Sequence, residues 1–388
     1  MQALINARVL TPRGLQTGLS VRLQGDAILD VTRAGQPLPD DCELIDLDGL
    51  VLAPGFIDLQ VNGGGDVLFN DAPNVETLRR IAGAHRRFGT TGMLPTLISS
   101  DRDVLRAAID AVRTAMATSV ASLLGIHIEG PFIAAARKGV HDPRTFRDID
   151  KADIDLMAAP GHGRTLLTLA PEQVDHARIA QLCQHGIIVA AGHTDASYEV
   201  TRAALDAGMS GFTHLFNAMS PLQGRAPGVV GAALEDRSSW CGIIVDGQHV
   251  HPAALRIALA AKPRGKVVLV TDAMPPVGGK RNDFRLGGRV ITCRDGRCTT
   301  ADGVLAGSCL DMASAVRNTV HLLDVPLAEA LRMASTYPAA VLGLDKSHGQ
   351  IAAGYRADLV ALDGALEVRS VWCGGVREQH VTAAARTN

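Results

Sequence analysis

The sequence has no long apolar run and almost no net charge, and these two absences exclude several classes of protein. None of its apolar stretches is long enough to span a bilayer. Residues 1–10 contain polar side chains and an arginine where a signal peptide needs an apolar segment. Basic residues number 38 and acidic residues 40, so the formal net charge of −2 indicates neither a nucleic-acid nor a membrane partner. We therefore expect a cytoplasmic protein without such partners.

Cysteine is also sparse. The seven cysteines are scattered and odd in number, which is typical of a reduced protein rather than of a disulfide framework. Cys293 and Cys298 flank an Asp-Gly turn in "CRDGRC". We interpret them as a facing pair in a β-hairpin and keep a metal or redox site as the less favoured alternative.

The middle of the chain alternates between apolar, β-branched runs and segments with a helical pattern. Several of those segments, such as 75–89 and 251–265, carry apolar residues at i, i+3 and i+4 and end in glycine. Eight such strand–helix units predict an α/β fold, a (β/α)8 TIM-like barrel. The expected strands are 55–61, 92–97, 123–129, 166–172, 186–193, 210–215, 241–247 and 266–272.

A doubly wound sheet is the alternative to a barrel. It would need fewer strands, and usually a glycine-rich nucleotide loop that opens directly into a helix. Glycines 63–65 follow the first strand, but no helical pattern begins there. The barrel is therefore the favoured fold.

Both ends of the chain read as short strands and turns without a helical period. This pattern predicts a small β-sandwich domain built from residues 1–53 and 345–388. Residues 54–344 would then form the metal-dependent catalytic barrel.

Acidic and imidazole side chains stand at the carboxyl ends of the expected strands, where barrels of this kind place their active sites. Glu129, His193 and His214 follow strands three, five and six and form a ligand set suited to a divalent metal. Three protein ligands leave one position for water. Asp272 ends the eighth strand and is a candidate proton carrier for that water.

Gln60 and Asn62 occupy the end of the first strand, two residues apart, so their side chains point the same way. Many metal-dependent hydrolases carry His-x-His at this point. Amides are poor metal ligands, so we interpret the pair as a vacant second-metal position and expect one divalent ion per subunit. Zinc is the ion that we expect first, with Fe²⁺, Co²⁺ and Mn²⁺ as alternatives.

An ordered series of motifs resembles the N-acetylglucosamine-6-phosphate deacetylase family of the amidohydrolase superfamily. The resemblance runs from about residue 50 to the C-terminus. The motifs are "PGFIDLQVNG", "LGIHIEGPF", "KGVHDP", "LAPE", "AGHTDA", "THLFNAMSPL", "GRAPG", "IVDGQHV", "LVTDAM", "LAGS" and "GQIAAGYRADLV".

The resemblance implies a specific reaction and a role for each matching residue. N-acetylglucosamine 6-phosphate would be hydrolysed to glucosamine 6-phosphate and acetate, in amino-sugar catabolism and cell-wall sugar recycling. Water activated by the metal would attack, with Asp272 as general base and acid and His141 beside the carbonyl. The implied substrate contacts are Val140, His141, Asn217, Ala218, Arg225, His249, Leu305, Ala306 and Gly307.

The resemblance also implies a homodimer in which Arg225 reaches the phosphate bound by the neighbouring subunit. Two departures from the family pattern are Ala226, where a glutamate is usual, and Ala306, where a serine is common. Some family members keep His-x-His at the first strand and can hold two metals, whereas others carry Gln-x-Asn and hold one. This chain, with Gln60 and Asn62, resembles the second group.

Three other functions remain as alternatives. Two histidines and a carboxylate also suit non-haem iron oxygenases, although those usually have a β-fold. A sister amidohydrolase could act on another acetamido sugar phosphate or on a cyclic amide. A non-catalytic scaffold would have lost its ligands, whereas all three ligands and Asp272 are present.

Overall fold

The computed structural model describes residues 1–159 and 161–379, and its centre is a parallel eight-stranded barrel. All eight strands lie in sequence order and each expected strand is present, so the predicted (β/α)8 barrel is confirmed. The strands are β6 (Phe56–Val61), β9 (Thr90–Ile98), β10 (Gly125–Glu129), β11 (Arg164–Leu169), β12 (Ile188–Ala191), β13 (Gly211–Phe212), β14 (Trp240–Ile243) and β15 (Val267–Leu269).

The first and last strands meet through a buried carboxylate. Asp58 on β6 is 0% exposed, and its two oxygens accept hydrogen bonds from Thr271 Oγ1 at 2.5 Å and Thr271 N at 3.2 Å. Burial raises the pKa of Asp58 to about 7, although these bonds oppose the rise. The amide of Asp272 donates to the carbonyl of Gln60 at 3.0 Å, which brings the ends of β6 and β15 together.

Helices surround the barrel because each presents an apolar stripe to the strands. In α2, Leu105, Ala108, Ile109 and Val112 repeat at helical spacing and all are buried. Every helix in the described residues is too short or too polar to cross a membrane. The α-helices are α1 (Val75–Arg86), α2 (Arg102–Ala117), α3 (Lys151–Met157), α4 (His176–Gln184), α5 (Tyr198–Asp206), α6 (Gly228–Glu235), α7 (Pro252–Ala261), α8 (Met312–Leu323), α9 (Leu327–Met333) and α10 (Thr336–Val341), and short 3₁₀ turns are η1 (Ala135–Arg137), η2 (Pro143–Thr145) and η3 (Pro171–Gln173).

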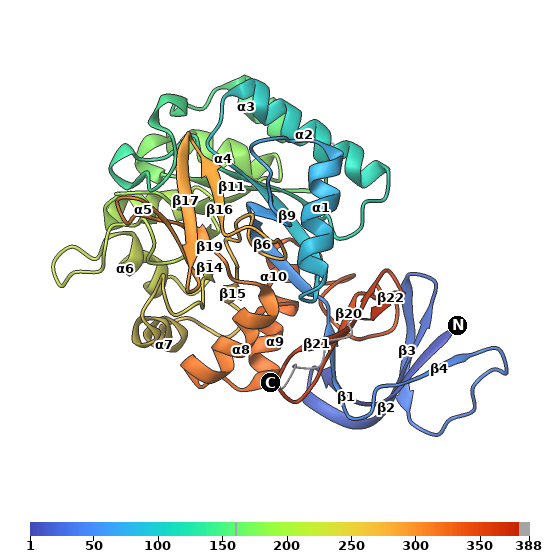
Figure 1. Ribbon diagram of the computed structural model, residues 1–388. Helices are drawn as coiled ribbons and strands as arrows, with labels where there is room; N and C mark the ends of the chain where they lie inside the picture. Colours follow the sequence, from blue (N-terminus) through green and yellow to red (C-terminus); the bar gives the residue numbers. More distant parts are fainter. Residues whose placement is uncertain (160, 380–388) are drawn as a thin grey trace.

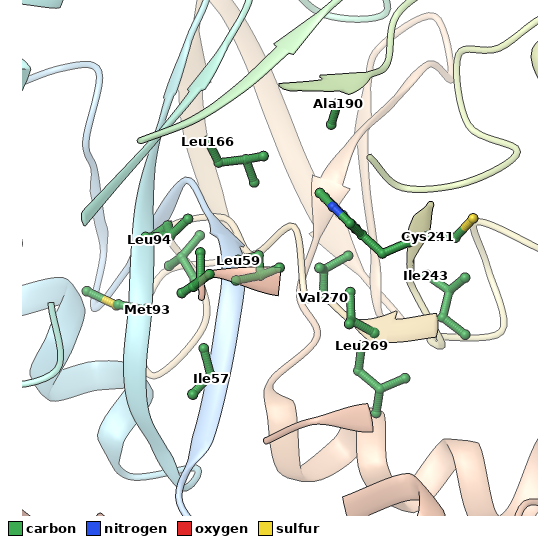
Figure 2. Packing of buried hydrophobic residues seen from close by; sticks show 14 of the residues in the cluster. Ile57, Leu59, Met93, Leu94, Leu166, Ala190, Cys241, Ile243, Leu269 and Val270 are labelled. Carbon is green, nitrogen blue, oxygen red and sulfur yellow. The ribbon is translucent and has the colours of Figure 1, made fainter. Parts of the chain in front are cut away.

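The barrel interior is a packed core. Leu59, Leu166 and Ala190 come from three different strands and Val270 directly follows a fourth, β15, and Figure 2 shows them within one cluster of buried apolar side chains. Each is at most 2% exposed. A filled interior leaves the loops at the strand ends as the place for a site.

A second sheet joins the two ends of the chain, seen in blue and red beside the barrel in Figure 1. Within it β20 pairs antiparallel with β5, which pairs parallel with β1. Its buried residues form a core separate from that of the barrel. The strands are β1 (Gln2–Thr11), β2 (Gly14–Gln24), β3 (Ala27–Arg33), β4 (Glu43–Asp46), β5 (Val51–Pro54), β20 (Leu359–Leu362), β21 (Val368–Cys373) and β22 (Val376–Gln379).

This sheet agrees with the expected terminal β-domain. The boundaries at residues 53/54 and 344/345 stay a proposal, and residues 380–388 lie outside the residues that the structure describes.

A four-stranded antiparallel sheet lies between β15 and α8 and was not predicted as a unit. Figure 1 shows β16, β17 and β19 in orange next to the barrel strands. The strands are β16 (Asp283–Leu286), β17 (Arg289–Arg294), β18 (Arg297–Thr300) and β19 (Leu305–Ser308), and a two-stranded ribbon after β6 consists of β7 (Gly63–Gly64) and β8 (Val67–Leu68).

Cys293 and Cys298 face each other across the β17–β18 hairpin, so their predicted pairing is confirmed. They are joined by a disulfide bond, and the expectation of a fully reduced chain is wrong for this pair. The geometry of the turn explains why these two cysteines can form a disulfide. A two-residue turn at Asp295 and Gly296, both with positive φ, places the two cysteines directly opposite each other. The other five cysteines are free.

We predict that Gly125→Ala strongly destabilises the barrel. Gly125 begins β10 with φ +155°, and an added Cβ would lie 1.9 Å from the carbonyl oxygen of Arg164 in the neighbouring strand. Because that atom belongs to the backbone of a paired strand, relief requires the strands to separate. The expected loss is roughly 3 kcal/mol of unfolding free energy, the upper end for overpacking, measured by urea denaturation.

Gly224→Ala is the matched control. Gly224 lies in an exposed loop, and an added Cβ there has no neighbour within 4 Å. Equal stability of the two variants would contradict the predicted clash.

Candidate active site

The predicted metal ligands meet at the carboxyl end of the barrel. Glu129 is the last residue of β10, and His193 and His214 each stand two residues beyond a strand. His193 has φ +51°, His214 has φ +34°, and Asp272 has φ +52°. Residues other than glycine rarely adopt this left-handed backbone conformation, and each one that does costs on the order of 1–3 kcal/mol of folding free energy. The surrounding fold holds them there, which turns their side chains inward above the barrel core.

The three ligand atoms are spaced as a single ion requires. His193 Nε2 and His214 Nε2 are 3.1 Å apart, and they lie 3.4 Å and 3.1 Å from Glu129 Oε1. A tetrahedral zinc ion with bonds of about 2.0–2.1 Å holds its ligands roughly 3.3 Å apart. All three residues are at most 8% exposed.

Hydrogen bonding also favours a cation between these atoms. The carbonyl oxygen of Arg137 lies 2.9 Å from His193 Nδ1, which places the ring proton on Nδ1 and the lone pair on Nε2. That lone pair faces His214 Nε2 and the carboxylate of Glu129. Acceptor atoms this close need a shared positive charge. These residues therefore fit a divalent metal, and no other group of acid and imidazole side chains among the described residues has this spacing.

The charges within the group are strongly linked. Burial alone would raise the pKa of Glu129, yet its contacts with the two neighbouring imidazoles hold that pKa well below its usual range. Burial lowers the pKa of His214, but the neighbouring carboxylate of Glu129 raises it overall. The site therefore stabilises a carboxylate beside positive charge.

Gln60 and Asn62 donate hydrogen bonds to the acids of the site. Gln60 Nε2 lies 2.9 Å from Glu129 Oε1 and 3.2 Å from Asp272 Oδ1, and Asn62 Nδ2 lies 2.6 Å from the same Asp272 oxygen. The two amides are 0–1% exposed. Their NH₂ groups therefore point at the carboxylates of Glu129 and Asp272.

Asp272 is half-buried beside this group. Burial and the charge of Glu129 raise its pKa to about 6. Its Oδ1 receives both amide hydrogen bonds, whereas within residues 1–159 and 161–379 no hydrogen bond to Oδ2 is present. One oxygen is therefore held in place and the other is available.

His141 lies against the ligands and is held neutral. Burial, followed by the charge of His193, lowers its pKa well below the usual range. The ring centroids of His141 and His193 are 4.3 Å apart. Ser99 Oγ lies 2.7 Å from His141 Nδ1. When this hydroxyl donates, Nε2 carries the ring proton and becomes a hydrogen-bond donor.

Most of the predicted site residues line one cavity of about 320 Å³, within the range of small-molecule sites. A larger cavity of about 530 Å³ opens near Ser122, Arg164 and Arg356, at the amino ends of the strands, and contains none of the predicted site residues. The predicted residues that line the smaller cavity are Glu129, Val140, His141, His193, His214, Asn217, Ala218, His249, Asp272, Leu305 and Gly307.

Two predicted substrate contacts lie outside this cavity. Arg225 belongs to an exposed loop of this chain and does not line it. Ala306 is 0% exposed and packs in the apolar cluster beneath β19, because its side chain points away from the face that Leu305 and Gly307 present.

Several residues at the site were not predicted from sequence. Ser99 contacts His141, Arg137 offers its carbonyl to His193, and Met274 lines the cavity. A backbone carbonyl leaves no residue-type signal, and a lone serine or methionine near a strand end is common. Their position after β9 and β15 and before the "KGVH" motif was the only available indication.

Comparison with known proteins gives consistent matches. Residues 51–379 match the model of the amidohydrolase family. The chain is 46% identical to an N-acetylgalactosamine-6-phosphate deacetylase of Shewanella sp. (strain ANA-3), over 84% of this chain and 82% of the relative. It is 37% identical to an N-acetylglucosamine-6-phosphate deacetylase of Haemophilus influenzae, over 92% and 94%. The crystal structure of N-acetylglucosamine-6-phosphate deacetylase from Pasteurella multocida superposes with a TM-score of 0.94 at 35% identity, covering 98% of this chain and all of that one.

Proposed function

The chain belongs to the amidohydrolase family, and from this premise we propose that it removes the acetyl group of N-acetylglucosamine 6-phosphate. The products are glucosamine 6-phosphate and acetate. The resemblance seen in the sequence motifs is thereby confirmed at the level of the family. The observation that carries the reaction is the convergence of Glu129, His193 and His214 beside the free oxygen of Asp272.

The ligand set would hold one divalent ion, which we propose is zinc. Imidazole nitrogens and a carboxylate are ligands that zinc accepts readily, and Fe²⁺, Co²⁺ and Mn²⁺ are the alternatives. When bound, such an ion polarises a carbonyl and lowers the pKa of water toward about 7. Gln60 and Asn62 occupy the second position with amide donors, which supports one ion per subunit.

Asp272 would move the proton. Its Oδ1 is fixed by Gln60 and Asn62, so Oδ2 faces the reaction as the proton acceptor. It takes a proton from the attacking water and returns it to the nitrogen of the leaving amine. The carbon–nitrogen bond breaks as that nitrogen is protonated. General acid–base catalysis of this kind contributes about 10²–10⁴-fold.

His141 would stabilise the charge that develops on the carbonyl oxygen. Its low pKa keeps the ring neutral, so Nε2–H is a donor that does not compete for the proton of water. Ser99 holds the ring in that orientation through Nδ1. The rest of the cavity wall would contact the sugar. It is formed by Val140, Asn217, Ala218, His249, Leu305 and Gly307.

The proposed reaction is tested by incubating the purified chain with N-acetylglucosamine 6-phosphate and measuring acetate and free amine together. We expect both products in equal amounts. Unphosphorylated N-acetylglucosamine is the control and should react much more slowly. Oxygen consumption without acetate release would instead support an oxygenase.

N-acetylgalactosamine 6-phosphate is the second candidate substrate, because the 46% identical relative carries that name. The two sugars differ only in the orientation of the hydroxyl at C4. Parallel measurements of kcat/KM with both epimers decide between them, and a preference for the galacto form would overturn the gluco assignment while leaving the deacetylase chemistry intact.

We also propose a homodimer in which Arg225 contacts the phosphate in the neighbouring subunit. Arg225 is exposed and lies outside the cavity of its own chain, as such a role requires. A guanidinium is well suited to bidentate phosphate binding. A cytoplasmic location stays a prediction.

Arg225→Ala should raise KM for the phosphorylated sugar about 10- to 100-fold with little change in kcat, because a charge-assisted contact worth about 1.5–3 kcal/mol is lost. Steady-state acetate release measures both constants. Arg106→Ala, on an exposed face of α2, is the matched control.

Hybrid dimers test whether Arg225 acts across the interface. In a dimer of one Arg225→Ala subunit and one Asp272→Asn subunit, the site with an intact Asp272 receives Arg225 from its partner. That site should bind substrate with the wild-type KM. A hybrid with the raised KM would mean that Arg225 serves its own subunit or no substrate.

A further inference from the structure

Three cysteine sulfurs lie together beneath the β19 wall of the cavity. Cys293 and Cys298 form the hairpin disulfide, and Cys309 Sγ lies 3.1 Å from Cys298 Sγ. All three sulfurs are within 4.8 Å of one another. Apolar residues of β8 and of the four-stranded sheet β16–β19, including Leu68, Phe284 and Ile291, surround them.

The three cysteines differ in access to solvent. Cys298 is 0% exposed and Cys293 is 6% exposed, whereas Cys309 is partly exposed. A thiol from solution therefore reaches Cys309 more readily than either sulfur of the disulfide. Cys309 therefore combines partial exposure with a direct contact to the buried bond.

We propose that Cys309 is the resolving thiol of a thiol–disulfide exchange centre that isomerises the Cys293–Cys298 bond to Cys298–Cys309. The thiolate of Cys309 attacks Cys298 Sγ, forming that bond while the old bond breaks and its electron pair leaves on Cys293. Cys293 takes up the proton that Cys309 lost, so no external oxidant or reductant is consumed.

The exchanged disulfide is the form that a small dithiol reduces. The dithiol attacks Cys309 Sγ and releases Cys298 as a thiol, and its second thiol then displaces Cys309. Two electrons pass from the dithiol, which becomes a cyclic disulfide, to the protein. Burial and the charge of Asp246 raise the pKa of Cys309 to about 11, which leaves a small thiolate fraction at neutral pH and slows the exchange.

The centre is joined directly to the active site. Ser308 precedes Cys309, and its amide donates to the carbonyl of Asp272 at 2.9 Å. The carbonyl of Ser308 accepts from the amide of Met274 at 3.0 Å. Forming a bond of about 2.0 Å from a contact of 3.1 Å draws the end of β19 toward the hairpin. The exchange therefore changes the wall formed by Leu305 and Gly307.

Peptide mapping distinguishes the two isomers. The full chain is purified without reductant, quenched in acid, alkylated and digested with trypsin, which cuts after Arg294 and Arg297. The Cys293–Cys298 form joins peptide 290–294 to peptide 298–317. The exchanged form releases peptide 290–294 with an alkyl label on Cys293 and leaves an internal loop in peptide 298–317. We expect both forms in the wild type.

Reduction kinetics test the relay. In limiting dithiol, Cys309→Ser should lose its disulfide at least about tenfold more slowly than the wild type, because attack through Cys309 is removed. Cys183→Ser, a partly buried thiol on the outer helix α4, should match the wild type. Thermal melting of each variant verifies that it is folded.

Two results would overturn the exchange centre. One is a wild-type rate of reduction in Cys309→Ser, together with the absence of labelled Cys293 in the unreduced wild type. The other is a three-thiolate metal site, seen as a cadmium charge-transfer band in reduced wild type but not in Cys309→Ser, with no exchanged isomer.

The link to the cavity is measured separately and rests on the proposed deacetylation. Oxidised Cys293→Ser, locked as Cys298–Cys309, should show KM at least about threefold different from that of Cys309→Ser. Equal KM values would overturn the link. A lack of acetate release in the wild type would reject the deacetylase assignment and leave the peptide map as the test of the exchange.

Discussion

Asp272→Asn is expected to lower kcat by about 10²–10⁴-fold while the bound metal stays in place, because this range is what a positioned proton carrier contributes. The substitution keeps the shape of the side chain and removes only its basicity. Its Oδ1 can still accept from Asn62 and Gln60, so the geometry of the site is preserved. The ligands Glu129, His193 and His214 are untouched.

Acetate release gives kcat, and elemental analysis gives the metal content of the same sample. Substrate affinity, measured by calorimetry on this slow variant, should stay near the wild-type value because the sugar contacts are intact. Asp103→Asn, an exposed carboxylate in the first turn of α2, is the control and should be fully active. A kcat within tenfold of the wild type would remove Asp272 from its assigned role.

Glu129→Gln is expected to lose the metal, and activity with it. The amide keeps the size of the side chain but removes the negative charge that the two imidazoles face at 3.1 Å and 3.4 Å. A divalent ion contributes several kcal/mol of charge stabilisation. The expected loss of kcat is therefore on the order of a thousandfold, since each 1.36 kcal/mol is tenfold.

Metal content and reconstitution are measured on the same preparations. The wild type should hold one ion per chain, lose activity with a chelator and regain it with one equivalent of zinc. Glu129→Gln should hold less than one ion and should not recover at that zinc concentration. Glu76→Gln, on an exposed turn of α1, should behave as the wild type. Two tightly bound ions per chain would contradict the interpretation of Gln60 and Asn62.

The barrel could be predicted because its signals are local. Each strand is a short apolar run and each helix repeats apolar residues every three to four positions, as Leu105, Ala108, Ile109 and Val112 do. The convergence of the candidate metal ligands could be predicted for a related reason. An acid or imidazole at the end of an apolar strand is costly unless it has a partner, and Glu129, His193 and His214 all lie within two residues of such an end.

The four-stranded sheet β16–β19 and the disulfide could be recognised only from the tertiary structure. Strands β16 to β19 are short and partly exposed, so their alternation of apolar and polar residues is too brief to be distinguished from a loop by sequence. The turn after Cys293 brings it opposite Cys298, and the return of β19 then places Cys309 against the pair. The spacing of the cysteines in the sequence does not indicate that Cys309 contacts Cys298.

The sequence by itself determined the kind of fold, the candidate ligand types and the absence of His-x-His at the first strand, because residue type and spacing define these. Only the tertiary structure decided how the ligands meet. His193, His214 and Asp272 adopt left-handed backbone conformations that are unfavourable in isolation, and only the packed barrel around them offsets that cost. The same packing puts the carbonyl of Arg137 behind His193 and the amides of Gln60 and Asn62 against Asp272. These contacts join residues far apart in sequence, so no local pattern could have specified them.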